Sequence, residues 1–444
     1  RQAGVKQWLT TDCTPRWLSF SDDPGTRRAL DIAAFNVYQP NPEPPRYAME
    51  TAWHFDKERS AHGLNRFLTT ETRIGYIGDT ISWDPVPSHE QFRMWMFGPV
   101  AYGSTSLMYW SGNRWRGGPW PQFGGVLDWS GKPEPDVEWL KELGAFFEKW
   151  GQRLVDNPVK ASVAVLTDFD QRSALQVYRH TPASPTILPE SFEAFHRLGM
   201  GVDSITGEDA ARVEKLRPYS LIVLAADTAL DGSAIPAALK KYVEEGGRVL
   251  ITPFTAYQSG DGVFRDDGFG ANLADLTGTM VRTGRRMGTA RDKVRKDQVV
   301  LWSLPGMRDL STVGVDGYCE LMDVSPDAEV IARFKSEEPI LNGRPAAVRK
   351  KLGKGSVIKL AFWSQDDSFL RLFRELAPNP GSPIADLLPF GIQAVPRSDG
   401  SIFILNTSSS PLEIPLTRAL TDRITGRRIG GKTPMKGYEV FWLE

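Results

Sequence analysis

The sequence contains few of the residues that build disulfide frameworks or common metal sites. Its 444 residues include only two cysteines, Cys13 and Cys319, and five histidines. Two cysteines cannot make a disulfide framework, and the chain has neither a CxxC pair nor an HExxH motif of the kind that binds zinc. We therefore expect that its function requires no metal and no other cofactor.

Two further absences restrict the class of partner. No run of about 18 apolar residues occurs, so the sequence predicts no transmembrane helix and no membrane partner. Lysine and arginine together number 53, against 54 for aspartate and glutamate. Such a balance gives no electrostatic reason to expect nucleic acid as a partner.

The chain also lacks an initial methionine and a signal-peptide pattern. It opens on Arg1 and runs almost directly into the apolar segment "VKQWLTTD". We interpret this as a chain that begins in the middle of a domain. Any leader peptide would precede Arg1, so the compartment is left open, with the cytoplasm favoured over secretion.

Four apolar runs near the start of the chain each end on polar or aromatic side chains. They are "VKQWLTTD" (5–12), "LDIAAFNVY" (30–38), "NRFLTTE" (65–71) and "STSLMYWSGN" (104–113), with Asp12, Asn36, Tyr38, Glu71 and Trp110 at or near their ends. Helix-like stretches separate these runs at roughly 30 residues a unit, which is the spacing of a (β/α)8 barrel. Because the carboxyl ends of barrel strands meet at one face, we expect these side chains to surround one cavity.

Four strands cannot close a barrel, and they would leave open edges. The sequence therefore predicts the second half of a TIM barrel, strands five to eight, over residues 1–157. The first half would come from upstream sequence or from a second chain. A helix over residues 134–150 is amphipathic and is expected to pack on the barrel wall. In an earlier helical stretch, Asp56 and Arg59 are three residues apart, which favours a structural ion pair.

The order and spacing of several short motifs resemble those of glycoside hydrolase family 42, the β-galactosidases with a barrel, a trimerisation domain and a small β-domain. The segments that carry the resemblance are Thr10-Thr11-Asp12, Phe35-Asn36-Val37-Tyr38, the helical "HFDKERS", Thr70-Glu71-Thr72, Ser82-Trp83-Asp84-Pro85 and "FGPVAYGSTSLMYWSGNRWRGG". Each motif alone is weak, but their order and spacing make the resemblance specific, and it covers nearly the whole chain.

The resemblance implies a retaining exo-acting β-galactosidase that acts on an oligosaccharide or other glycoside. The glutamate of the seventh strand is the family's nucleophile, a role that falls on Glu71 here, and the family's acid/base glutamate would lie upstream of Arg1. We expect Glu71 to be ionised at neutral pH and held by hydrogen bonds from neighbours such as Asn36 or Tyr38. The residues expected to bind the substrate are Asp12, Asn36, Tyr38, Trp83, Trp110 and Trp120.

Alternatives remain open at this point. Glu71 could be a solvated or helix-capping carboxylate, and Trp110 could belong to the barrel core. In addition, residues 119–125 read "PWPQFGG", where the family has a Glu-Lys-Phe-His motif that binds galactose hydroxyls. The substrate could therefore be another glycoside, such as an α-L-arabinopyranoside, or the chain could be a non-catalytic carbohydrate-binding or assembly protein.

The pattern changes after about residue 157. Strands and helices alternate over residues 158–385, which predicts a doubly wound, flavodoxin-like parallel sheet. This region resembles the family's trimerisation domain, which is similar to class I amidotransferases, and implies a homotrimer. Its segment "LITPFTAYQ" has no cysteine nucleophile, so we expect it to be non-catalytic. Short alternating strands over 386–444, among them "LEIPLT" and "DRIT", predict a small antiparallel β-sandwich.

Overall fold

The structure is a computed structural model. It describes residues 6–12, 29–40, 45–74, 85–121, 123–167, 184–227, 229–230, 234–259, 262–286, 299–302, 313–314, 318–336, 338–379 and 381–444. Of the helices in these ranges, none combines the length and the apolar character needed to cross a membrane.

The chain divides into two compact units, each with its own core. The first unit comprises residues 1–160, 196–201 and 381–444, and the second comprises 161–195 and 202–380. The C-terminal segment thus packs with the N-terminal part of the chain. The three-domain division expected from the sequence stays a prediction.

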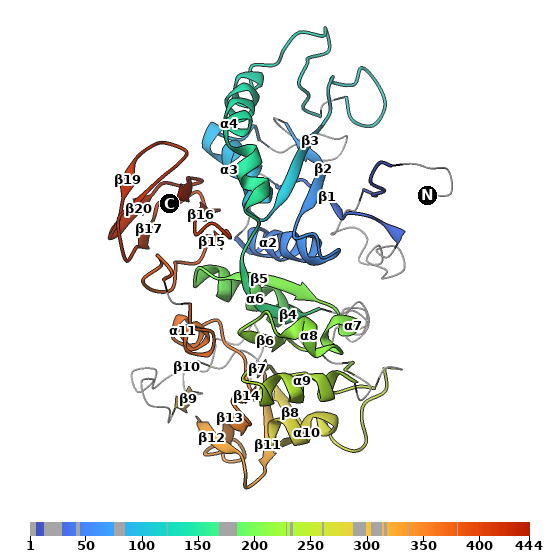
Figure 1. The fold of residues 1–444 in the computed structure, drawn as a ribbon, viewed down its shortest axis with the longest axis vertical. Helices are drawn as coiled ribbons and strands as arrows, with labels where there is room; N and C mark the ends of the chain where they lie inside the picture. The colour runs from blue at the N-terminus through green and yellow to red at the C-terminus, as the bar shows by residue number, and fades with distance from the viewer. Residues whose placement is uncertain are drawn as a thin grey trace. The chain divides into compact units, whose positions relative to one another are not determined.

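The N-terminal part of the first unit repeats a strand followed by a helix. Its elements are β1 (Ala34–Val37), α2 (Pro45–Ser60), β2 (Phe67–Arg73), α3 (His89–Ala101), β3 (Ser104–Trp110) and α4 (Val137–Asp156). The strands pair in parallel in the order β1-β2-β3 (Figure 1). Three of the four expected strands, with an intervening or following helix each, are therefore confirmed.

The remaining expected strand, over residues 5–12, is wrong for the part that the structure describes. Residues 6–12 lie beside the start of β1 but do not form a strand. The backbone N–H of Leu9 donates to a carboxylate oxygen of Asp31 at 2.9 Å, and the Thr10 hydroxyl donates to the carbonyl of Ile32 at 2.8 Å. One backbone hydrogen bond joins the two segments, from the Asp31 N–H to the Leu9 carbonyl at 2.8 Å, but side chains take the neighbouring ones.

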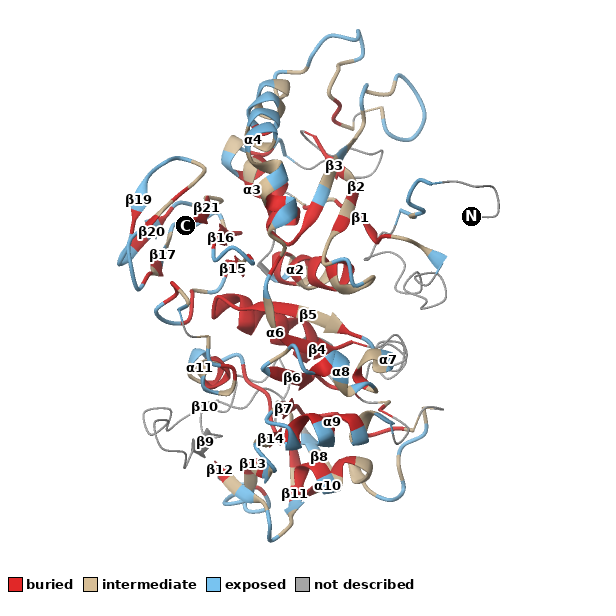
Figure 2. Cartoon of the chain, viewed as in Figure 1, coloured by how far each residue is buried: buried red, intermediate tan, exposed pale blue. Residues whose placement is uncertain are grey.

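The two faces of this small sheet differ in character. Phe35 and Val37 of β1 belong to the hydrophobic core that packs beneath the helices, and Figure 2 shows β1 and much of α2 and α3 as buried. Leu107 and Tyr109 of β3 pack against the same core. Because side chains alternate along a strand, Trp110 lies on the opposite face, which the helices do not cover.

The C-terminal segment of the first unit is built from short strands. They are β15 (Ile392–Pro396), β16 (Ile402–Asn406), β17 (Leu412–Pro415), β18 (Leu420–Thr421), β19 (Arg428–Ile429), β20 (Lys432–Met435) and β21 (Val440–Leu443). All their pairings are antiparallel, in sheets β15-β16-β21, β17-β20 and β18-β19. The expected strand "DRIT" is wrong, because it forms the turn between β18 and β19, in which the Asp422 carboxylate accepts hydrogen bonds from Ile424 and Thr425.

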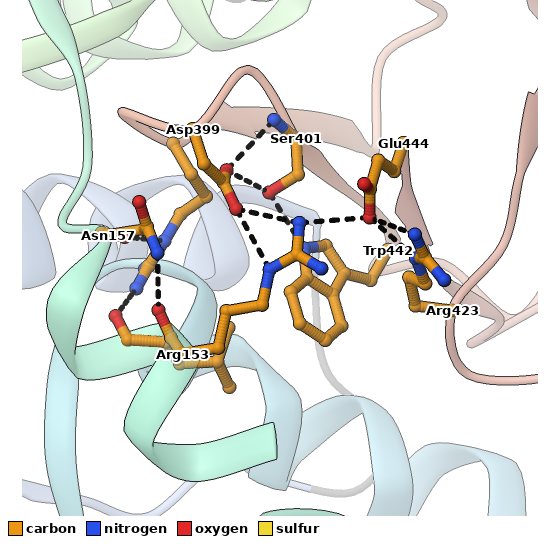
Figure 3. A network of polar contacts seen from close by, with 9 residues as sticks. Arg153, Asn157, Asp399, Ser401, Arg423, Trp442 and Glu444 are labelled. Carbon is orange, nitrogen blue, oxygen red and sulfur yellow. Dashed lines mark hydrogen bonds and ion pairs between the residues drawn. The ribbon is translucent and has the colours of Figure 1, made fainter.

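Two arginines fasten this C-terminal segment to the helices of the first unit. The buried Arg397 donates to backbone carbonyls at the C-terminal ends of α3 and α4, including Ala101 at 3.1 Å and Asn157 at 2.7 Å. A positive charge at the C-terminal end of a helix interacts favourably with the helix dipole. Arg153 of α4 reaches Asp399 and Glu444, each at 2.9 Å (Figure 3).

The second unit contains most of the remaining elements. They are β4 (Ala161–Leu166), α6 (Ser184–Arg197, whose last two residues belong to the first unit), β5 (Gly201–Ile205), α7 (Gly207–Ala210), α8 (Val213–Leu216), β6 (Leu221–Leu224), α9 (Ala234–Glu244), β7 (Arg248–Ile251), η1 (Ala271–Leu273), α10 (Ala274–Thr277), β8 (Thr279–Arg286), β9 (Val299–Trp302), β10 (Val313–Gly314), β11 (Tyr318–Val324), β12 (Glu329–Lys335), β13 (Pro345–Leu352), β14 (Gly355–Leu360) and α11 (Asp367–Leu376).

The large sheet of this unit is mixed. Its order is β10-β9-β12-β13-β14-β7-β6-β4-β5. The run β4-β6-β7-β14 is parallel, whereas the pairings from β14 out to β10 are antiparallel. Taken in chain order, the strands from β5 to β14 follow the flavodoxin-like 2-1-3-4-5 arrangement. The doubly wound expectation therefore holds for this part, and a wholly parallel sheet is wrong.

A buried polar cluster lies within the second unit. Glu320 is fully buried, and it accepts from Lys359 at 2.8 Å and from the Tyr257 hydroxyl at 2.6 Å. The adjacent Cys319 is a free, buried thiol, and burial together with the charge of Glu320 raises its pKa to about 12. A thiol held protonated in this way is not a nucleophile at neutral pH.

Candidate functional site

The carboxylate of Glu71 lies at the carboxyl end of β2, on the first unit. The hydroxyl of Tyr38, just beyond the end of β1, donates a hydrogen bond to Glu71 Oε2 at 2.7 Å. The backbone carbonyl of Tyr38 accepts a hydrogen bond from the Tyr47 hydroxyl of α2 at 2.5 Å, which holds Tyr38 in position. The expectation that Tyr38 contacts the candidate nucleophile is therefore met in the structure.

Beside Tyr38 and Glu71, three more polar side chains are hydrogen-bonded to one another. Asn36 Nδ2 donates to Asp12 Oδ2 at 2.7 Å. The Thr70 hydroxyl lies 2.8 Å from Asp12 Oδ1 and 3.0 Å from Asn36 Oδ1. Asn36 thus bonds Asp12, and it is Tyr38 that supplies the hydrogen bond expected at Glu71.

An irregularity in the pairing of β1 with β2 brings these groups together. Phe35 pairs with Thr69, but the next residue, Asn36, pairs with Glu71, so Thr70 is skipped in the ladder. An extra residue of this kind re-aims the side chains around it and is frequent next to active sites. It lets both Thr70 and Glu71 reach the side chains that follow β1.

Burial and charge both act on the Glu71 carboxyl. Its pKa lies above the ordinary value because partial burial raises it, while the hydrogen bond from Tyr38 lowers it and the nearby Asp12 carboxyl raises it again. Burial and the neighbouring Glu71 and Asp12 carboxylates also raise the pKa of Tyr38, which keeps the phenol protonated. Tyr38 is thus the group that favours the ionised form of Glu71.

An aromatic loop follows β3. The ring of Trp115 lies 5.6 Å from that of Trp110 and 5.7 Å from that of Trp120, measured between centroids. In the same loop, the ring of Phe123 meets the edge of Tyr38 at 5.7 Å. The loop that carries the tryptophans is therefore attached to the tyrosine that holds Glu71.

Trp129 is hydrogen-bonded to the backbone of this loop. Its indole N–H donates to the carbonyls of Trp115 at 3.0 Å and Pro121 at 2.8 Å. The guanidinium of Arg114 stacks over the Trp129 ring at 4.6 Å and pairs with Glu134 at 2.5 Å. The one polar group of the indole, its N–H, is thus used inside the loop, which fits a structural role for Trp129.

The structure brings most of the predicted site residues into one neighbourhood. Asp12, Asn36, Tyr38 and Glu71 are joined through hydrogen bonds and charge. The loop with Trp120, which is linked to Trp110 of β3 through Trp115, adjoins them through Phe123. Trp83 lies outside the described residues. In the part of the chain that the structure describes, no group of three or more His, Cys, Asp or Glu side chains is arranged to hold a metal ion.

Two residues of the cluster were given no role from the sequence. Thr70 was visible only as part of the threonine pair before Glu71, and its contacts depend on the register shift described above. Phe123 follows Gln122 in a Pro- and Gly-rich loop, and nothing local indicates its contact with Tyr38 across the site. The one indication available in the sequence was that Thr70, a hydroxyl residue, directly precedes the carboxylate of Glu71.

Two substitutions are expected to move the acidic limb of the pH–rate profile in opposite directions. If Glu71 attacks as a carboxylate, activity falls as pH drops through its pKa. Asp12→Asn removes a nearby negative charge, lowers that pKa and extends activity to lower pH. Tyr38→Phe removes the hydrogen bond that favours the carboxylate and moves the limb to higher pH. The limb is measured as kcat/KM against pH in the complete protein, and a shift of the same sign in both variants contradicts this assignment.

Comparison with known proteins shows which proteins this chain resembles. Residues 161–381 match the family model described as the β-galactosidase trimerisation domain. Over 353 residues the chain is 26% identical to β-galactosidase Bga of Halorubrum lacusprofundi, a stretch covering 76% of this chain and 47% of that relative. The chain spans about half the length of the first curated relatives it matches.

Solved structures show the same fold. The β-galactosidase from Bacillus circulans sp. alkalophilus aligns with a TM-score of 0.82 at 19% identity, over 98% of this chain and 63% of that one. Gan42B, a GH42 β-galactosidase from G. stearothermophilus, aligns with a TM-score of 0.81 at 20% identity, with the same coverage of both chains. At identities this low, the alignments show that the folds are alike and no more.

Proposed function

We propose that this chain, a relative of the β-galactosidases of glycoside hydrolase family 42, forms the nucleophile-bearing part of a retaining exo-glycosidase. The proposed substrates are oligosaccharides or glycosides with terminal β-D-galactosyl or related residues. One observation carries the proposal: a strand-end carboxylate, Glu71, held by the Tyr38 hydroxyl at 2.7 Å among further polar side chains.

In this mechanism Glu71 attacks the anomeric carbon while the bond to the leaving oxygen breaks. A second carboxyl group, about 5–5.5 Å away, gives its proton to that oxygen and afterwards takes one from the water that hydrolyses the glycosyl-enzyme. Family resemblance assigns this second role to a glutamate upstream of Arg1. Asp12, whose side chain is tied to Asn36 and Thr70, is proposed to shape the pocket.

The remaining predicted site residues receive binding roles in this proposal. Asn36 and Asp12 present oxygens beside the carboxylate, where they can accept hydrogen bonds from sugar hydroxyls. Trp83 and Trp110 are proposed to stack on an apolar sugar face. The β1-β2-β3 sheet with its helices is proposed to be half of a TIM barrel, followed by a non-catalytic α/β domain and a C-terminal β-sandwich.

One observation bears on which terminal sugar the site accepts. Residues 119–125 contain Trp120 and Phe123 but neither glutamate nor histidine. A site that recognises a hydroxyl with a charged side chain discriminates strongly for it, whereas an aromatic wall does not. We therefore keep a second candidate substrate, an α-L-arabinopyranoside, whose ring has the same geometry as β-D-galactopyranoside.

The proposed function is tested by assaying the complete protein against nitrophenyl glycosides. Hydrolysis of the β-D-galactoside or the α-L-arabinopyranoside, with the first sugar product keeping its anomeric configuration, supports the proposal. The relative kcat/KM of the two substrates decides between the candidates. Binding of the glycosides without any turnover would instead favour a non-catalytic carbohydrate-binding or assembly protein.

We also propose that the protein assembles as a homotrimer. The support is the match of residues 161–381 to a family described by trimerisation. Sedimentation velocity of the complete protein is expected to give the mass of three subunits. A monomer at micromolar concentration contradicts this assignment.

A further inference from the structure

The aromatic loop after β3 exposes indole rings that the fold does not need for its core. Trp120 is 40% exposed, although an indole is among the largest apolar side chains, and it extends the contact from Trp110 through Trp115. We call Trp110, Trp115 and Trp120 the indole row. Trp129 is 45% exposed, but its N–H is bonded to the loop backbone and the guanidinium of Arg114 stacks over its ring. We therefore do not count it in the row.

The position of the indole row relative to Glu71 follows from two contacts. Phe123, three residues after Trp120, packs on Tyr38, whose hydroxyl bonds the Glu71 carboxylate. Trp110 ends β3 on the sheet face that the helices do not cover, which is also the face of Tyr38 by alternation from the buried Val37. The row therefore begins beside the carboxylate and leads away from it along the loop.

Chemistry divides the surroundings of Glu71 into two parts. Asp12, Asn36 and Thr70 offer carboxylate, amide and hydroxyl groups close to the reacting end, as recognition of a sugar ring by its hydroxyls requires. The indole row offers flat apolar faces further out on an exposed loop. An exo-acting enzyme encloses the terminal sugar and leaves the other side of the scissile bond open to the rest of the substrate.

We propose that the indole row binds the leaving-group side of the substrate, by stacking on a ring attached directly across the scissile glycosidic oxygen. This inference rests on the proposed glycosidase function and adds a substrate class to it. The ligand chemistry is a ring with an apolar face, which a second sugar or an aryl group can provide. A leaving group without a ring gains nothing from the row.

The test compares Trp120→Ala with the unchanged complete protein on three substrates of the same terminal sugar. An aryl glycoside and a disaccharide both carry a ring on the leaving side, whereas the glycosyl fluoride does not. The variant is expected to lose about 3- to 10-fold in kcat/KM on a ring-bearing substrate, the size of one aromatic stacking contact, and to keep its rate on the fluoride. Loss with the aryl glycoside alone, or the disaccharide alone, identifies which ring the row takes.

A second readout does not depend on turnover. Calorimetric binding of a thio-linked disaccharide or a thioaryl glycoside, whose sulfur linkage resists hydrolysis, is expected to weaken by the same factor in Trp120→Ala. If the unchanged protein hydrolyses none of the three substrates but Trp120→Ala still weakens binding, the proposed glycosidase function is wrong and the binding role of the indole row is supported. Equal loss on all three substrates, or unchanged values throughout, overturns the inference even if the protein is an active glycosidase.

A matched control removes an exposed aromatic ring elsewhere in the same unit. Phe390 is 50% exposed and precedes β15, outside the candidate site. Phe390→Ala is expected to leave both the kinetic ratios and the binding constants unchanged. A change of the same size in Phe390→Ala would attribute the effect of Trp120 to general loss of surface aromatics and contradict the inference.

Discussion

Glu71→Gln in the complete protein is expected to lower kcat by at least about 10³-fold, which corresponds to roughly 4 kcal/mol of transition-state stabilisation. The amide keeps the shape of the side chain and can still accept a hydrogen bond from Tyr38, but it cannot form a glycosyl-enzyme ester. The folded state should be unchanged, as measured by circular dichroism and thermal unfolding. The rate is measured with a nitrophenyl glycoside that the unchanged protein hydrolyses.

A matched control and a chemical rescue separate catalysis from structure. Glu138 lies on α4 with 72% of its side chain exposed, in an ion pair with Lys141, so Glu138→Gln is expected to keep full activity. In Glu71→Ala, added azide is expected to restore turnover and to give a glycosyl azide of inverted configuration, because it attacks from the side that the carboxylate has vacated. Near-normal activity in Glu71→Gln would remove Glu71 from the mechanism.

Asp56→Ala is expected to lower the free energy of unfolding of the first unit by about 3–5 kcal/mol. Asp56 is 1% exposed and accepts from Arg59 at 2.7 Å and from His196 Nε2 at 2.6 Å. Its loss leaves the guanidinium of Arg59, which is 0% exposed, without its buried carboxylate. A buried charge that loses an ion-pair partner is costly because less of its desolvation is offset.

The stability effect is measured by urea unfolding, with Glu138→Gln as the control again. Its ion pair with Lys141 is exposed on both sides, so its removal is expected to cost less than about 1 kcal/mol. If Asp56→Ala costs no more than Glu138→Gln, the buried pair does not contribute to the stability of the first unit. Conversely, an equally large loss in Glu138→Gln would contradict the expected difference between a buried and an exposed ion pair.

Local patterns in the sequence predicted the secondary structure well where one signal dominated. The β1, β2 and β3 segments are apolar runs that end on polar groups, and their parallel pairing was expected. The ion pair of Asp56 with Arg59 follows from helical spacing and is confirmed. The resemblance to family 42 is confirmed as well, by the match of residues 161–381 to the β-galactosidase trimerisation domain and by the similarity to curated β-galactosidases.

The failures have physical causes that local patterns do not contain. Residues 6–12 resemble a strand, but Asp31, which is 22 residues away from Leu9, takes the backbone N–H that a strand would use. The other partner of the Asp56 carboxylate, His196, is 140 residues distant in the chain. The hairpin formed by β13 and β14 was expected from "AAVRKKLGKGSVIKLAF", but β9, β10 and β12, which extend the sheet beyond it, were not.

For the candidate site, residue types were easier to predict than their contacts. The sequence placed Asp12, Asn36, Tyr38 and Glu71 near one another because they follow successive apolar runs. Which of them bond was decided by the register shift that skips Thr70, and this shift has no mark in the residue pattern. The site roles themselves stay predictions, and they depend on one carboxylate.

The most direct test of the central claim is to trap the covalent intermediate and find the residue that carries it. A 2-deoxy-2-fluoro glycoside with a good leaving group slows the second step, so a glycosyl-enzyme accumulates if the mechanism is retaining. Trypsin cleaves after Arg66 and Arg73 and releases the peptide Phe67–Arg73, in which Glu71 is the sole carboxylic side chain. Mass spectrometry is predicted to find the fluorosugar on this peptide; a stoichiometric label on any other peptide would contradict the account.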